Sequence, residues 1–501
     1  MNVTSRKTAA PARALLVALA VALLALVLVP AAARADEASD APAYSEDLVG
    51  NRTYYATVDD AMKAAYDGAV IVMNRDWQLA DTLQVKDNSD VTIDMNGHKI
   101  AGNGSSSVIK MRAGSSLTLG SDASQTFSFT GYCHENGGSG TFSVTSGGLV
   151  TGGNSNMGGA VYMCGGNSLF LSNVAVAGNH GDYGGGVYTF PGCTVTINRG
   201  ATITRNGALN GGGIYMYGMD TNEATNVLMD DGSINANYAT GKGGGIFSYA
   251  DATDVRLENN STISENESNS GGAGIYLAYT HFNVESADRT GSMNKNWSGG
   301  DSGGASDGGG AIHVENVAWQ DHRGTIVGLN LYKNYSAVHG GAIYIGQAYT
   351  YVTDCTLTRN WSEKCGGGII VGADHCSLTN CTITDNTCDY DGTVYEGGGV
   401  FVGCDYDLTL SGKCTIKNNH RNKNGSADDL FLSDGLFGAH AYILGGVDAG
   451  SEVGIRTGMT KDQMVGKNIT TYSDGTYFMD YGNYGVTHGS DHGGDLWQRV
   501  G

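Results

Sequence analysis

Two pairs of adjacent carboxylates are the residues of this chain best suited to acid–base chemistry. They are Asp230-Asp231 and Asp428-Asp429. Two carboxyl groups on one face of a fold can serve as general acid and as base or nucleophile in glycoside hydrolysis. Adjacent acids are also common as turn residues and as solvated surface charge. We interpret both pairs in this second way.

Basic and imidazole side chains that would complete such a site show no grouping along the sequence. The cations suited to a lyase-type base are Lys295, Arg323 and Lys333, and the histidines in the same region are His281, His313, His322 and His375. An isolated His is far more often a surface or structural residue than a ligand or a base. The sequence therefore predicts no catalytic residue.

A recurring aromatic position offers binding rather than catalysis. Along most of the chain a glycine run is followed by a β-branched aliphatic residue and then usually by a ring. The aliphatic residues are Val161, Val187, Ile214, Ile246, Ile275, Ile312, Ile343, Ile369 and Val400. The residues after them are Tyr162, Tyr188, Tyr215, Phe247, Tyr276, His313, Tyr344, Ile370 and Phe401.

Because side chains alternate across a strand, the aliphatic residues should point inward and the rings outward. An outward ring stripe is a candidate platform for sugar rings or for a partner protein. The alternative is that neighbouring rings stack on one another and stiffen the sheet.

The elements that position these residues repeat. An aliphatic residue followed three places later by Asn recurs with a spacing of 26 (Asn360 to Asn386) to 38 residues (Asn296 to Asn334). The recurring residues are Asn179, Asn206, Asn237, Asn266, Asn296, Asn334, Asn360, Asn386 and Asn419. A drifting period of this length is typical of stacked supersecondary units. Stacked Asn side chains can form hydrogen-bonded ladders, so we assign the nine residues to architecture.

One unit reads as three strands, at residues 193–197, 201–204 and 213–216, and no helical pattern separates the strands. The sequence therefore predicts an all-β, right-handed parallel β-helix with an N-terminal capping helix. The capping helix begins at Thr57-Val-Asp-Asp60, where Thr57 can cap and Asp60 can reach back. With roughly 4.8 Å per coil, ten to twelve coils would make a rod about 50–60 Å long.

The predicted organisation has four parts. Residues 1–35 form a signal peptide, with a basic start, an apolar run and a small-residue cleavage site. Residues 36–52 form a polar lead-in, residues 53–430 the capped β-helix, and residues 431–501 a β-rich C-terminal cap or tail. No later stretch is long enough to span a membrane, so the mature chain is expected to be exported and soluble.

Composition limits the partners. The formal net charge is −21, which argues against nucleic acid, and the 78 glycines follow no collagen period. Ten cysteines in an exported chain suggest disulfides. Cys355, Cys381 and Cys414 share one place in the repeat and should stack on neighbouring coils, although the pairing stays open. No cofactor is predicted, although calcium could bind the acidic loop at residues 299–307.

The repeat resembles that of the chlamydial polymorphic outer membrane proteins. Gly340-Gly-Ala-Ile343 together with the aliphatic-x-x-Asn motif carries this resemblance, and residues 53–102 resemble the cap and first coils of pectate-lyase-like β-helix proteins. The usual Phe before x-x-Asn is aliphatic here, and too few residues follow Asn419 for a membrane barrel. The resemblance implies a surface-exposed, adhesin-like passenger.

Three functions remain open. The first is a secreted or cell-surface adhesin-like protein that binds an extracellular glycan or a host or neighbouring-cell protein through a repeat face. The second is a polysaccharide lyase or glycoside hydrolase, although the chain lacks the Gly-His-Gly and Arg-Ile-Lys motifs that hydrolases of this shape share. The third is a purely structural surface rod.

Overall fold

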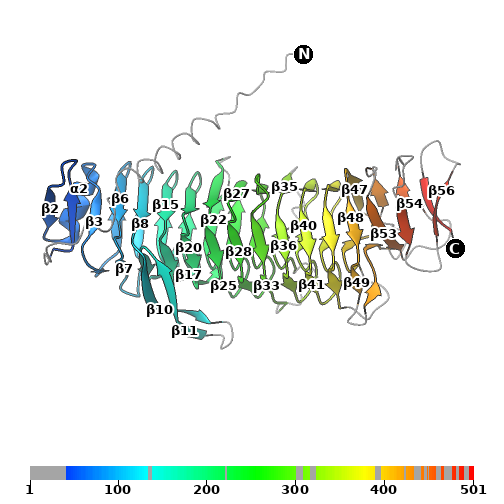
Figure 1. The fold of residues 1–501 in the computed structure, drawn as a ribbon, viewed down its shortest axis with the longest axis horizontal. Helices are drawn as coiled ribbons and strands as arrows, with labels where there is room; N and C mark the ends of the chain where they lie inside the picture. Colours follow the sequence, from blue (N-terminus) through cyan, green and yellow to red (C-terminus); the bar gives the residue numbers. More distant parts are fainter. Residues whose placement is uncertain are drawn as a thin grey trace, which may run out of the picture.

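The chain forms a parallel β-solenoid of about 11 turns, drawn out into a long rod (Figure 1). The computed structural model describes residues 41–433 except 134–137, 220–222, 301–307, 316–322, 390–396, 405 and 422–424, and beyond residue 441 it describes short segments. The predicted signal peptide lies outside the described residues. Within the described part, all regular structure is β except for one helix. The predicted all-β solenoid is confirmed.

Each regular coil contains four strands rather than the three predicted. In one coil these are β19 (Thr194–Asn198), β20 (Thr202–Thr204), β21 (Gly207–Asn210) and β22 (Ile214–Gly218). The missed strand, β21, begins directly after the recurring Asn206. It is short and contains glycine, so its sequence lacks the alternation that marks the other three.

Strands of successive coils stack in register to form three long sheets. β19 pairs in parallel with β15 (Ser168–Ser172) and with β23 (Thr225–Asp230) in an 18-stranded sheet. β20 and β22 lie in two columns of a 26-stranded sheet, and β21 belongs to an 11-stranded sheet. Each sheet therefore presents one outward face whose side chains repeat once per coil.

The core fills the space between the sheets. All nine aliphatic residues that follow the glycine runs are fully buried in one continuous apolar cluster, which confirms their predicted inward direction. The glycines before them allow close contact between coils. A Cβ atom on Gly341 would lie 2.2 Å from the carbonyl oxygen of Gly367 in the next coil, a distance that no side chain tolerates.

The recurring asparagines form the predicted ladder inside the rod. From Asn206 onward, each side-chain oxygen accepts from the backbone and side-chain amides of the Asn one coil earlier, at 2.9–3.1 Å. Asn179, the first of the series, accepts from the Gly153 amide instead, and all nine side-chain amides donate to a backbone carbonyl. All nine residues are at most 2% exposed. A buried amide in this setting is stable only because its donors and acceptors are satisfied.

The N-terminal end carries the predicted helix, α2 (Val58–Tyr66). The Thr57 hydroxyl accepts from the Asp60 amide at 3.1 Å and donates to the Asp60 carboxylate at 2.8 Å, as a capping box requires. Ala61, Met62 and Ala65 are buried against the first coils. The predicted lead-in differs from the structure, because its residues Ala43–Glu46 form strand β1, which pairs with β3 (Ile71–Met73).

A long hairpin arm leaves the rod near its N-terminal end (Figure 1). It consists of β10 (Gln125–Cys133) and β11 (Gly138–Ser146), an antiparallel pair that the sequence reading missed. Phe129 packs on Ala175 and Ala177 of the neighbouring coil. Tyr132 stacks face to face on Tyr238, with ring centroids 3.8 Å apart. The arm therefore covers the outer face of several coils.

The predicted disulfides are absent from the described residues. Nine cysteines, all but Cys133, take part in no disulfide. Cys355, Cys381 and Cys414 do stack at equivalent positions, but each is buried and its thiol donates to backbone carbonyls. Burial raises the pKa of the Cys355 thiol to about 12. The stacked position therefore directs these thiols to carbonyl oxygens rather than into a sulfur–sulfur bond.

The C-terminal part continues the sheets through β52 (Tyr442–Leu444) and β53 (Glu452–Thr457), each of which pairs in parallel with the preceding coil. Most of the remaining predicted C-terminal region lies outside the described residues. No helix of the described part has the length and apolar character to cross a membrane.

Candidate binding surface

The predicted ring stripe forms one continuous stack along the rod, on the side of its strands opposite the core. We call the seven residues from Tyr162 to Tyr344 in this stripe the buried ring stack. Their centroid separations, in order along Tyr162, Tyr188, Tyr215, Phe247, Tyr276, His313 and Tyr344, are 5.7, 5.3, 4.9, 5.3, 4.4 and 4.5 Å. Ile370 interrupts the series, and Phe401 stacks on Phe431 at 5.9 Å.

Of the two interpretations of the ring stripe, the structure favours stacking of neighbouring rings over an exposed platform. Tyr188, Tyr215, Phe247, Tyr276 and His313 are between 1% and 9% exposed, and only the end rings Tyr162 and Tyr344 are half-buried. A second layer of rings, made of Tyr183, Phe190, Tyr217 and Tyr249, packs over part of the stack. Within the stack the faces of each inner ring contact neighbouring rings. Alternation fixed their direction correctly, but it did not reveal this cover.

The two Asp pairs have structural positions. Asp230 accepts from the side-chain amide of Asn259 at 2.6 Å, and Asp231 has a left-handed backbone, with φ of 56°, in a turn. Asp429 ends the asparagine ladder, where its carboxylate accepts from the Asn419 backbone amide at 2.7 Å. Asp428 is fully buried and accepts from the Gly397 amide at 2.8 Å. The two pairs lie on different coils, nearly 200 residues apart in sequence.

Asp428 gives the last coils a pH-dependent stability. Burial raises its pKa to about 7, aided by the charge of Asp429 and opposed by the Gly397 amide and Arg421. The folded chain therefore holds a proton that the unfolded chain releases near pH 4, so this group's stabilising contribution falls as the pH rises from about 4 to 7. At pH 7.5 we expect Asp428→Asn to raise the free energy of unfolding by a few kcal/mol. This is the approximate free-energy equivalent of the pKa difference between the folded and unfolded carboxyl.

At pH 5 the gain in the free energy of unfolding should be clearly smaller, because pH 5 is only slightly above the pKa of the unfolded carboxyl, and the gain should vanish below about pH 4, where the carboxyl is protonated in both states. Denaturant unfolding of both proteins at the two pH values measures the difference. A variant that is less stable than the wild type at pH 7.5 would contradict this assignment.

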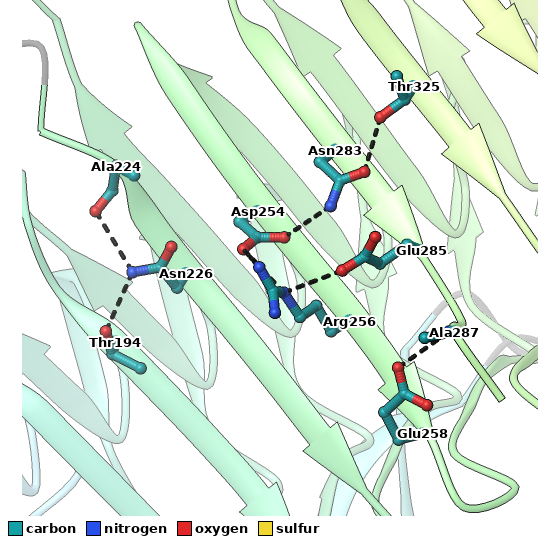
Figure 2. A network of polar contacts seen from close by, with 10 residues as sticks. All are labelled: Thr194, Ala224, Asn226, Asp254, Arg256, Glu258, Asn283, Glu285, Ala287 and Thr325. Atoms are coloured by element: carbon teal, nitrogen blue, oxygen red, sulfur yellow. Dashed lines mark hydrogen bonds and ion pairs between the residues drawn. The ribbon is translucent and has the colours of Figure 1, made fainter. Parts of the chain in front are cut away.

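Charged side chains also gather on the outer face of the 18-stranded sheet (Figure 2). Arg256 of β27 (Ala252–Glu258) donates to Asp254 at 2.8–2.9 Å and contacts Glu285 of β31 (His281–Glu285) at 3.2 Å. Asp254 also accepts from Asn283, which in turn accepts from Thr325 at 2.6 Å. The two carboxylates are thus engaged by neighbouring coils. This network links the side chains of neighbouring strands. It does not present a pair of unpaired carboxylates to a substrate.

The remaining predicted groups do not come together. His281 accepts from the Arg323 backbone amide, and His375 stacks on Tyr349 at 4.8 Å. His322 and most of the acidic loop at 299–307 lie outside the described residues. Among the residues that are described, no three His, Cys, Asp or Glu side chains are grouped so as to hold a metal ion.

A second aromatic series, which the sequence reading missed, lies on the 11-stranded sheet. The residue after most ladder asparagines points outward there, while the next residue, usually Ser or Ala, is buried in every coil but the last. In register from coil to coil, the outward residues are Tyr238, Glu267, Trp297, Tyr335, Trp361, Thr387 and His420. Three rings on consecutive coils therefore form an outer aromatic row, Trp297, Tyr335 and Trp361.

The outer aromatic row is accessible to a ligand. Its strands are β33 (Trp297–Ser298), β37 (Tyr335–Ser336) and β41 (Trp361–Ser362), along one long edge of the rod (Figure 1). Trp297 is 38% exposed, and the other two rings are half-buried. Ring centroids are 5.5 Å apart between Trp297 and Tyr335 and 4.8 Å apart between Tyr335 and Trp361.

The positions beside the row are small or acidic. Gly299 lies under the Trp297 indole, since a Cβ atom there would meet the ring at 3.2 Å. The Tyr335 hydroxyl donates to the exposed carboxylate of Glu363. Rings beside a small residue and a carboxylate offer apolar contact and hydrogen-bond acceptors together. This is the best-formed candidate surface among the described residues.

A sequence signal for the row exists. Three ladder asparagines are followed by a ring and then by Ser, in Asn296-Trp-Ser298, Asn334-Tyr-Ser336 and Asn360-Trp-Ser362. Comparison of the chain with protein-family models, with curated proteins and with solved structures finds no match. The function therefore has to be argued from the surface itself.

Proposed function

We propose that the protein is an exported, adhesin-like rod that binds an extracellular glycan through the outer aromatic row. One observation carries this proposal: three consecutive coils hold Trp297, Tyr335 and Trp361 in register on an outward face. A contiguous group of partly exposed aromatic rings on a protein surface is a common mark of a binding site. Because the rings are anchored to a rigid stack of coils, little conformational freedom is lost when a ligand binds.

Two features of the sequence support the exported, adhesin-like part of the proposal. One is the signal-peptide pattern of residues 1–35. The other is the resemblance of the repeat to the passenger repeats of chlamydial polymorphic outer membrane proteins. A rod of coils also holds a binding surface away from its point of attachment.

A polysaccharide-cleaving enzyme is the second candidate. Among the described residues, its structural support is the group of carboxylates around Arg256, and those side chains already pair with one another. The structural-rod alternative predicts no ligand, and the same binding experiment tests it.

The test is retention of the purified protein on a panel of immobilised neutral and acidic polysaccharides, with polymer length recorded before and after incubation. We expect retention without shortening. Trp297→Ala together with Trp361→Ala should weaken the retained interaction at least about tenfold, the loss typical of truncating central binding residues.

Tyr279→Ala is the matched control. Tyr279 is 40% exposed, close to the value for Trp297, but it directly follows β30 (Ile275–Ala278) of the 26-stranded sheet, and its ring contacts Tyr249. Loss of retention in the row variant with unchanged retention in the control supports the proposal. Shortened polymer chains would support the enzyme instead, and retention that survives loss of both indoles would place the binding surface elsewhere.

A further inference from the structure

A column of cations accompanies the outer aromatic row. Lys295, Lys333 and Arg359 each lie two residues before a ring of the row, at the corner where the chain enters the 11-stranded sheet. All three are exposed, and all three have a left-handed backbone with φ of 54–55°. Because this conformation recurs at each corner, the three side chains start from equivalent positions on consecutive coils.

The cations and the rings occur on the same three coils. At the same corner, the preceding coils carry Ala236 and Glu265, and the following coils carry Asp385 and Asn418. One further cation, Arg205, occupies this corner nearer the N-terminus, but it lies against Phe142 of the arm at 4.1 Å. Along the described coils from Asn179 to Asn419, the combination of ring and exposed cation therefore occurs in one strip, which has an acidic corner at each end.

At the middle corner of the strip two cations share one phenol, while the carboxylate of Glu363 beside the rings accepts from Tyr335. Arg359 donates to the Tyr332 hydroxyl at 3.1 Å, and the Lys333 ammonium lies 5.0 Å from the centroid of the same ring. Hydrogen bonds from Lys333 and Arg359 lower the pKa of the Tyr332 phenol, as a positive environment requires. Lys295 is partly neutralised by Glu265, at 2.9 Å.

We propose that this strip binds an anionic glycan, with carboxylate or sulfate groups on the cation column and sugar rings on the outer aromatic row. Arg and Lys are the side chains that recognise such anions. This inference rests on the proposed function, because it assigns the ligand of the same row. The net charge of −21 does not prevent such binding, since at physiological salt charges are screened beyond about 8 Å.

The ligand should lie along the rod axis. Coils repeat at about 4.8 Å, so the three rings and three cations span roughly 10 Å in that direction. A polymer whose charges repeat along its length can contact several coils at once, whereas a single charged sugar can contact only one cation. Single-stranded nucleic acid also combines stacking with phosphate charge, but an exported chain of this overall charge favours a glycan.

The experiment compares three polymers with the same backbone: dextran, carboxymethyl dextran and dextran sulfate, with poly(dT) as a fourth probe. We expect retention on one or both charged dextrans, weaker retention on dextran, and a loss of retention as salt is raised. Comparison of the two charged forms distinguishes carboxylate from sulfate recognition. Oligomers long enough to cross three coils should bind more tightly than shorter ones.

The decisive variant replaces all three cations, Lys295→Gln, Lys333→Gln and Arg359→Gln. It should reduce retention on the charged dextrans at least tenfold and flatten the salt dependence. The control replaces Lys63, Lys86 and Lys413 by Gln, which changes the net charge equally at exposed positions elsewhere. Glu265→Gln should strengthen retention, because it frees Lys295 from its carboxylate partner.

The outcomes separate the two proposals. If the Trp297 and Trp361 variant loses binding while the cation variant does not, the anionic ligand is wrong and the aromatic binding row stands. If no polysaccharide is retained, both proposals fail. Tighter binding of poly(dT) that needs the same residues would overturn the glycan assignment. If an otherwise wild-type chain with Arg359→Lys keeps wild-type retention, the loss in the cation variant is due to the missing charge rather than to a folding defect.

Discussion

Replacing Asn296 by alanine is expected to lower the free energy of unfolding by about 4 kcal/mol, because it leaves buried polar groups without partners. The Asn296 side chain accepts from the backbone and side-chain amides of Asn266, both at 3.1 Å. It also donates to the Ile263 carbonyl and to Asn334, both at 3.0 Å. Removing it orphans the Ile263 carbonyl and the Asn266 backbone amide in the middle of the rod, where no water reaches them.

Asn294→Ala is the matched control. Asn294 lies two residues away on β32 (Ser292–Asn294) and points outward. Its side-chain amide donates to the Ser292 hydroxyl on the same strand. We expect a change within about 0.5 kcal/mol for this surface position. Urea unfolding followed by circular dichroism measures both variants. Equal effects at positions 294 and 296 would mean that the ladder contributes no more than an ordinary surface amide.

The parts of the fold that could be predicted from sequence are those that repeat and have one physical solution. A β-branched residue after a glycine run, as at Ile343, has no stable place except the core. An Asn that recurs once per coil, as at Asn296, can be buried only if its neighbours in the stack satisfy it. Both positions were therefore assigned correctly, and together they fixed the parallel solenoid.

The outward faces could not be predicted in the same way, because alternation gives the direction of a side chain but not what covers it. Tyr276 and Trp297 are both outward rings on strands of the solenoid. Tyr276 is 2% exposed and Trp297 is 38% exposed, since other rings pack beside the first and small residues flank the second. A ring recurs at the position of Tyr276 in nearly every coil, which indicates stacking. Rings at the position of Trp297 occur on three consecutive coils, which indicates a local site.

The missed elements are those that break the repeat. The arm at β10 and β11 is an insertion between two coils, and its docking depends on Ala175 and Ala177 lying where later coils carry polar residues. The fourth strand of each coil is two to four residues long, too short for a periodic signal. The Arg256 network combines charged side chains from two coils and a polar side chain from a third, and no single repeat contains it.

Replacing Tyr276 by alanine is expected to lower the free energy of unfolding by about 3–5 kcal/mol, the usual cost of truncating a buried ring. The ring is stacked between Phe247 and His313, at 5.3 and 4.4 Å, and its hydroxyl accepts from the Lys242 ammonium at 2.6 Å. Its removal leaves a gap in the middle of the buried ring stack, and the adjoining rings lose a contact face on each side.

Tyr276→Phe separates the ring from its hydroxyl. It keeps both stacked contacts and should cost about 1 kcal/mol, the typical worth of one hydrogen bond. The folded Tyr276→Ala protein should still bind any ligand of the outer aromatic row as tightly as the wild type, because Tyr276 and Trp297 lie on different sheets. Unfolding curves and retention on the polysaccharide panel together distinguish a role of Tyr276 in stability from a role in ligand binding. A variant with wild-type stability and lost retention would show that the buried ring stack, and not the outer aromatic row, contacts the ligand.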